Sequence, residues 1–145
     1  SDYGKGFLTD RILKTVIEMS REQKVPVIVD PKGADFTKYR KATVLKPNLG
    51  EAYAAAKMTS SARLDDVAKQ LLTLSEVDML LITRSEAGMS LFEMNGKRAD
   101  FPVKAKEVKD VTGAGDTVLS FICLALANGL DMHEAAQLAN TAASL

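Results

Sequence analysis

The 145-residue sequence has few of the side chains that form cross-links and metal sites, because it contains one cysteine and one histidine. A single cysteine excludes a disulfide framework and suits a reducing compartment. Since Cys123 stands inside an apolar helical stretch, we expect a buried structural thiol. His133 is alone, which makes a metal site built on several imidazoles improbable, and we expect it on the surface in the first turn of the last helix.

The sequence also lacks a charge excess and a long apolar run. Its 19 basic and 19 acidic residues give no general attraction to nucleic acid or anionic lipid. No apolar run approaches the roughly 18 residues of a membrane span, and no signal peptide follows Ser1. The length and the 46% apolar content are typical of one globular domain. We therefore expect a cytoplasmic protein with no nucleic-acid or membrane partner.

Apolar patterning predicts an alternation of strands and helices. Continuous apolar runs typical of buried parallel strands lie at 26–30, 43–46 and 79–83. Helices are expected from the patterning at 7–23, 49–57 and 63–75, with an alanine-rich last helix after Asp131. Asn95-Gly96, between residues 89–92 and 98–101, predicts a β-hairpin. The alternation predicts an α/β layer sandwich with a mainly parallel sheet.

The most informative stretch is residues 110–116, Asp-Val-Thr-Gly-Ala-Gly-Asp, which opens onto an apolar helix that Asn128 and Gly129 end. A glycine-bearing turn at a helix N-terminus presents unpaired N–H groups and the positive end of the helix dipole, which together form an anion site. The carboxylate of Asp116 would compete with an anion, unless it takes a proton from an attacking group while the amides hold the developing charge. The alternative is a glycine-rich helix start whose dipole Asp116 stabilises, and the spacing alone leaves both open.

Polar residues follow the predicted strands, where ligands bind in open α/β sheets. Asn48 and Glu51 share one helix face; their oxygens can hold Mg²⁺ through water, or they can form a capping box, and both roles can coexist. Asp30 and Lys32 lie in a turn-like segment, where the lysine can neutralise a phosphate. Thr83 begins the loop that leaves the third strand.

The 110–116 heptapeptide resembles the C-terminal signature of the ribokinase-like carbohydrate kinases, also called the phosphofructokinase-B family. The resemblance implies a ribokinase-like three-layer α/β/α sandwich that uses ATP and Mg²⁺. It implies Asp116 as the general base and an anion hole formed by Gly113, Ala114 and Gly115. The family's Asn-Xaa-Xaa-Glu motif matches Asn48 and Glu51, the implied magnesium residues. The residues that the resemblance assigns to the nucleotide are Asn48, Thr83, Gly88 and Asn140, and Ser85 stands where the family's loop commonly has glycine.

Three longer stretches are similar to the branch of this family that phosphorylates heptose 7-phosphate. They are residues 2–6, 30–36 and 83–90. This resemblance implies ATP-dependent formation of heptose 1,7-bisphosphate, on the way to the ADP-heptose of bacterial lipopolysaccharide. It places Lys5, Asp30 and Lys32 at the sugar phosphate and implies a homodimer in the full-length protein.

Other functions stay open, namely another ribokinase-family sugar kinase and an inactive fragment or sugar-binding module. A dinucleotide oxidoreductase is disfavoured, because the third glycine of its fingerprint is absent after Gly115. Both ends of the sequence look cut, since no strand precedes the first helix and Leu145 falls inside a helical pattern. We therefore expect residues 1–145 to be the C-terminal portion of a single kinase domain, truncated at both ends and inactive alone.

Overall fold

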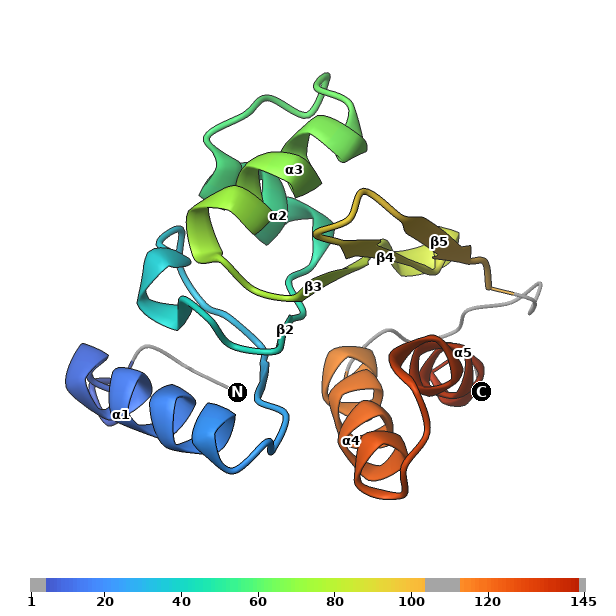
Figure 1. Cartoon of the computed structure of the whole chain (residues 1–145). Helices are drawn as coiled ribbons and strands as arrows, with labels where there is room; N and C mark the ends of the chain where they lie inside the picture. Colours follow the sequence, from blue (N-terminus) through green and yellow to red (C-terminus); the bar gives the residue numbers. More distant parts are fainter. Residues whose placement is uncertain (1–4, 104–112, 144–145) are drawn as a thin grey trace.

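The computed structural model describes residues 5–103 and 113–143, which form an alternation of helices and strands (Figure 1). The helices are α1 (Asp10–Glu22), α2 (Leu49–Ala56), α3 (Leu64–Ser75), α4 (Ala114–Ala127) and α5 (Met132–Ala142), with 3-10 turns η1 (Thr37–Tyr39) and η2 (Ser85–Ala87). The strands are β1 (Ile28–Val29), β2 (Val44–Leu45), β3 (Met79–Thr83), β4 (Met89–Glu93) and β5 (Arg98–Phe101). The predicted alternation is confirmed.

The strands form one mixed sheet in the order β1-β2-β3-β4-β5. β1, β2 and β3 pair in parallel, whereas β3, β4 and β5 pair antiparallel. The expected hairpin joins β4 to β5, and its turn is held by the Lys97 N–H, which donates to Asn95 Oδ1 at 2.8 Å. The parallel strands put their carboxyl ends at one edge of the sheet, which is where polar residues follow them in the sequence.

Helices cover both faces of the sheet. Successive residues of a strand point to opposite faces, and β3 uses this to join two cores. Leu80 and Ile82 belong to a core shared with α1, α2 and α3, whereas Leu81 belongs to a second core shared with α4 and α5. Figure 1 shows α2 and α3 on one side of the strands and α4 beside α5 on the other. The three-layer α/β/α arrangement is therefore confirmed.

Several elements are shorter than expected, and the largest differences are in α1, in β1 and in β2, which covers 44–45 instead of 43–46. α1 starts at Asp10 because the hydroxyl of Thr9 caps it, accepting the Ile12 N–H at 3.3 Å, and Phe7 is 81% exposed ahead of it. β1 has two residues because Val27 joins the ladder through its carbonyl alone. That carbonyl accepts the Val44 N–H at 3.0 Å, whereas the Val27 N–H donates to the hydroxyl of Thr43.

The expectation that Cys123 is buried was wrong, because its side chain is exposed. The buried residues of α4 include Val118, Ile122 and Ala125, and a residue directly after Ile122 is rotated by about 100° away from that face. His133 is exposed, as expected, and its ring meets the ring of Phe101 edge-on at 5.3 Å.

The end of α4 agrees with the prediction. Asn128 is its C-cap, and Gly129 follows with a φ of +83°, the left-handed backbone that glycine favours. None of the helices within the described parts of the chain is long and apolar enough to cross a membrane.

Candidate active site

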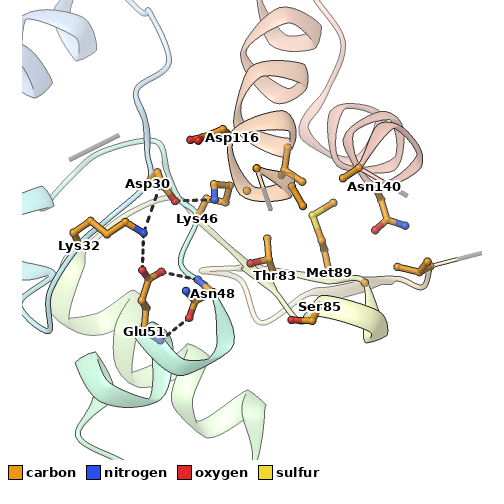
Figure 2. A pocket seen from close by; sticks show the side chains of 17 residues that line it. Asp30, Lys32, Lys46, Asn48, Glu51, Thr83, Ser85, Met89, Asp116 and Asn140 are labelled. Carbon is orange, nitrogen blue, oxygen red and sulfur yellow. Dashed lines mark hydrogen bonds and ion pairs between the residues drawn. The ribbon is translucent and has the colours of Figure 1, made fainter. Parts of the chain in front are cut away.

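A pocket of about 350 Å³ lies at the carboxyl ends of the parallel strands. Its walls come from the residues that follow β1, β2 and β3, from the first turn of α4 and from α5 (Figure 2). This edge is where open α/β sheets bind ligands. Most of the residues that the sequence nominated come together there, although they are spread from residue 30 to residue 140.

The glycine turn forms the start of α4. Gly113 is the N-cap with a φ of +82°, a conformation that strains any residue with a Cβ. The first backbone hydrogen bond of the helix runs from the Thr117 N–H to the Gly113 carbonyl at 3.0 Å. The N–H groups of Ala114, Gly115 and Asp116 therefore precede the helical ladder and have no partner within it. All three residues line the pocket.

Asp116 is the third residue of α4, and its side chain is exposed at the pocket. Within the described residues, its carboxylate has no hydrogen bond or ion pair; the contact from the Ser120 hydroxyl goes to the Asp116 carbonyl. The carboxylate is thus able to accept a proton from a bound molecule. The helix dipole also stabilises a negative charge at this position, so the geometry is compatible with both interpretations of the turn.

Asn48 and Glu51 form a complete capping box at the start of α2. The Glu51 N–H donates to Asn48 Oδ1, and the Asn48 N–H donates to Glu51 Oε2, each at 2.9 Å. The other oxygen of Glu51, Oε1, accepts from Lys32 Nζ at 2.8 Å. The capping interpretation is confirmed, and both residues also line the pocket.

The donor set at this corner fits Mg²⁺ in an outer shell. Amide and carboxylate oxygens are hard ligands, and Mg²⁺ usually keeps several of its waters. A carboxylate has about four lone-pair sites, so Glu51 can accept a metal-bound water beside its two present donors. Direct ligation through Oε1 would place the metal against the Lys32 ammonium. Among the described residues, no group of three or more His, Cys, Asp or Glu side chains is placed to hold an ion.

Four charged side chains of alternating sign follow one another along the pocket, in the order Glu51, Lys32, Asp30 and Lys46 (Figure 2). Lys32 Nζ lies 4.0 Å from Asp30 Oδ2, and Lys46 Nζ lies 2.7 Å from Asp30 Oδ1. Lys46 was missed by the sequence analysis. A lysine that ends a short, otherwise apolar strand directly before Pro47 and Asn48 was a usable signal, because charged residues are rarely buried without a partner.

The loop after β3 holds Thr83, Ser85 and Gly88, which all line the pocket. Ser85 has a φ of +49°, in the left-handed region, which gives a backbone reason for the glycine that the family's loop commonly has there. A Cβ on Gly88 would lie 1.9 Å from the Phe101 carbonyl oxygen. Gly88 is therefore required by the fold, whatever it binds.

Asn140 and Lys5 differ in how the structure places them. Asn140, on α5, is buried, lines the pocket and donates from Nδ2 to the Pro102 carbonyl at 2.9 Å. Lys5 is exposed and is not among the residues that line the pocket. Its contact with a sugar phosphate stays a prediction.

Comparison with known proteins agrees with this architecture. Residues 6–145 match the family described as pfkB family carbohydrate kinase, and the chain belongs to this family. It is 52% identical, over 147 aligned residues, to the bifunctional protein HldE of Geotalea uraniireducens and to that of Geobacter metallireducens. Each alignment covers 100% of this chain and 30% of the relative. The chain thus spans less than a third of the length of these curated relatives.

Solved structures show the same fold. The ribokinase of Arabidopsis thaliana, complexed with ribose and ATP, superposes with a TM-score of 0.78 at 26% identity, covering 94% of this chain and 46% of that chain. Phosphofructokinase-2 from Escherichia coli gives the same TM-score and coverage at 18% identity, which supports the fold alone. The ribokinase-like fold is therefore confirmed over a part of the length of these kinases.

Proposed function

We propose that this chain supplies the phosphoryl-transfer site of an ATP-dependent kinase that phosphorylates heptose 7-phosphate at its anomeric hydroxyl. One observation carries the chemistry: a single pocket combines three features. These are the N–H groups that precede the helical ladder of α4, the Asp116 carboxylate, which has no partner among residues 5–103 and 113–143, and the ammonium of Lys46. The choice of heptose rests on the three stretches at 2–6, 30–36 and 83–90. The 52% identity to HldE proteins also supports it.

In this mechanism, the anomeric oxygen attacks the γ-phosphorus of ATP. The bond between that phosphorus and its bridging oxygen breaks, ADP leaves, and the hydroxyl proton passes to Asp116. The N–H groups of Gly113, Ala114 and Gly115 hold the charge on the transferring group. Such transfer depends mainly on positioning and electrostatic stabilisation, which preformed backbone donors supply without rearranging.

The remaining residues bind and orient. Asn48 and Glu51 would hold Mg²⁺ through water, and the ion neutralises phosphate charge when it is bound. Thr83, Gly88 and Asn140 would line the nucleotide side of the pocket, and Lys32 would face the phosphate of the sugar. The shares of 46% and 94% in the ribokinase superposition support residues 1–145 as a portion of one such domain.

The test uses the complete gene product with ATP, Mg²⁺ and heptose 7-phosphate, and detects a bisphosphate by ³¹P NMR. Fructose 6-phosphate and ribose serve as competing acceptors. Asp116→Asn should lower kcat by roughly 10²–10⁴, the scale for a lost general base. Asp66→Asn is the matched control, because Asp66 is also the third residue of a helix, is exposed and lies outside the pocket.

Each outcome of this experiment is informative. A preference for fructose 6-phosphate or ribose would replace heptose with another sugar and leave the kinase chemistry intact. Binding of a sugar without turnover would favour a sugar-binding module. An Asp116→Asn variant that kept more than about a third of wild-type turnover would remove Asp116 from the role of general base.

A further inference from the structure

Lys46 is a buried charge at the end of β2. Its side chain is 4% exposed, and its Nζ lies 2.7 Å from Asp30 Oδ1, on a side chain that is 9% exposed. Asp30 is its one partner among the described residues. Taking both charges out of water is costly, and apolar residues of similar volume are often as stable in such positions. Stability alone is therefore a weak reason for this pair.

The position of Lys46 gives a better reason. A Cβ built on Gly115 would lie 3.5 Å from Lys46 Nζ, so the ammonium lies directly beside the first turn of α4. Figure 2 shows Lys46 between Asp30 and that turn. Because residue 115 has no side chain, no methyl group separates the ammonium from the N–H groups that precede the helical ladder.

The ammonium also has donors to spare. A lysine carries three N–H donors, and within the described parts of the chain the contact with Asp30 uses one of them. Lys46 lines the pocket, so a ligand oxygen held by the α4 amides can meet a further donor from Lys46. A full positive charge and several backbone N–H groups would then converge on one anion in a poorly hydrated place, where each is worth more than in water.

We propose that Lys46 is a catalytic residue that binds a non-bridging oxygen of the transferring phosphoryl group, and that Asp30 is a positioning residue that aims it. The proposal rests on the kinase function above and reassigns Asp30, which the sequence resemblance placed at the sugar phosphate. Asp30 also lies 4.0 Å from the Lys32 ammonium. It thus connects two cations, one beside the α4 turn and one beside Glu51.

The decisive experiment compares Lys46→Met with the double variant Lys46→Met/Asp30→Asn in the complete gene product. Lys46→Met removes the ammonium and leaves a buried carboxylate, whereas the double variant leaves a neutral pair and no buried charge. We expect both to lose roughly 10²–10³ in kcat, the scale for one missing donor to the transition state. If Lys46 only neutralised Asp30, the double variant would recover wild-type turnover, and that result would overturn the proposal.

Asp30→Asn alone separates positioning from sugar contact. If Asp30 is a positioning residue, Asp30→Asn should lower kcat by less than Lys46→Met does and leave the KM for the sugar unchanged. An increase in that KM at constant kcat would show instead that Asp30 contacts the sugar. Lys14→Met is the control, because Lys14 lies on α1 with a side chain that is 75% exposed, and it should change neither constant.

A second measurement does not depend on the sugar. Inorganic tripolyphosphate, titrated by calorimetry into the 145-residue chain, should bind at least about tenfold more weakly to both Lys46 variants, a loss of 1.4 kcal/mol or more. Equal affinity in wild type and variants would refute the role of Lys46. If tripolyphosphate binding depends on Lys46 but heptose 7-phosphate is not turned over, the proposed substrate fails and the role of Lys46 stands. Should Lys46→Met fail to fold, the double variant decides.

Discussion

Replacing Gly88 by alanine should destabilise the chain strongly, for two reasons that can be separated. Gly88 has a φ of +82° and a ψ of −132°, a region that is nearly exclusive to glycine and costs other residues about 1–3 kcal/mol. The new methyl group would also lie 1.9 Å from the Phe101 carbonyl oxygen. That atom is backbone in β5, paired through Met89, so relief requires the strand to move, at a further cost of about 1–3 kcal/mol.

The expected loss is therefore about 2–6 kcal/mol, out of the roughly 5–15 kcal/mol that a domain has. At about 2–4 °C per kcal/mol, the melting temperature should fall by at least about 4 °C. Gly96→Ala is the matched control. Gly96 has a φ of +86° in the β4–β5 turn, but a Cβ there meets nothing within 4 Å. Gly96→Ala should therefore lower the free energy of unfolding by only about 1–2 kcal/mol, the cost of a left-handed backbone at a residue with a side chain.

Urea unfolding, followed by circular dichroism, gives the free energy of unfolding of both variants, which can be compared when their m-values are equal. The reasoning is refuted if Gly88→Ala destabilises the chain no more than Gly96→Ala does, because the close approach to β5 would then cost nothing. The comparison also affects how activity data are interpreted. If a substitution at Gly88 abolishes kinase activity, displacement of β5 is a sufficient explanation, and the loss is not by itself evidence that Gly88 contacts the nucleotide.

Three further predictions concern separate features. Glu51→Gln should raise the Mg²⁺ concentration that gives half-maximal rate. Glu134→Gln, in the matching capping box of α5, should lower the free energy of unfolding by about as much as Glu51→Gln does, about 1 kcal/mol or less, and leave the Mg²⁺ dependence unchanged. Equal Mg²⁺ curves for both variants would show that Glu51 acts only as a cap. Cys123 should react with a maleimide in the folded chain, but more slowly than glutathione at pH 8, because burial raises the pKa of its thiol; labelling only in urea would contradict its exposure. The hydroxyl and N–H of Thr37 donate to Asp35 and lower the pKa of its carboxyl below the ordinary 3.8. The folded state is therefore stabilised above that pH, and the stabilisation is lost as the pH falls through the lower folded pKa. In Asp35→Asn, the free energy of unfolding should fall less steeply with acid, and an unchanged pH dependence would show that these hydrogen bonds are not kept in solution.

Local signals predicted much of the fold. Asn95-Gly96 placed the hairpin, and Asp131 placed the start of α5, because turns and caps depend on residues a few positions apart. The start of α1 was misplaced because Phe7 continues the apolar pattern, while the hydroxyl of Thr9 ends it by capping the helix. Pattern alone does not weigh a single hydrogen bond against an exposed aromatic ring.

Contacts between distant residues limited the rest. α4 carries apolar residues on nearly all sides, so its sequence does not indicate which side faces the core, and Cys123 was assigned to the wrong one. Lys46 and Gly115 are brought together by the fold, and nothing in the sequence near either residue announces the other. The motif residues of the site could be nominated from the chain. The sequence around Lys46 indicates a buried charge, but it does not indicate that this charge lies beside the first turn of α4.

The two capping boxes show why motif and role are separate questions. Asn48 with Glu51, and Asp131 with Glu134, make the same pair of reciprocal hydrogen bonds at 2.9–3.0 Å. Among the described residues, only the first box also meets an ammonium, from Lys32 at 2.8 Å, and lines the pocket. The local sequence determines the cap in both helices, and the surrounding fold determines whether that cap can also act on a ligand. A role for Glu51 beyond the cap must therefore appear in measurements that Glu134 does not affect.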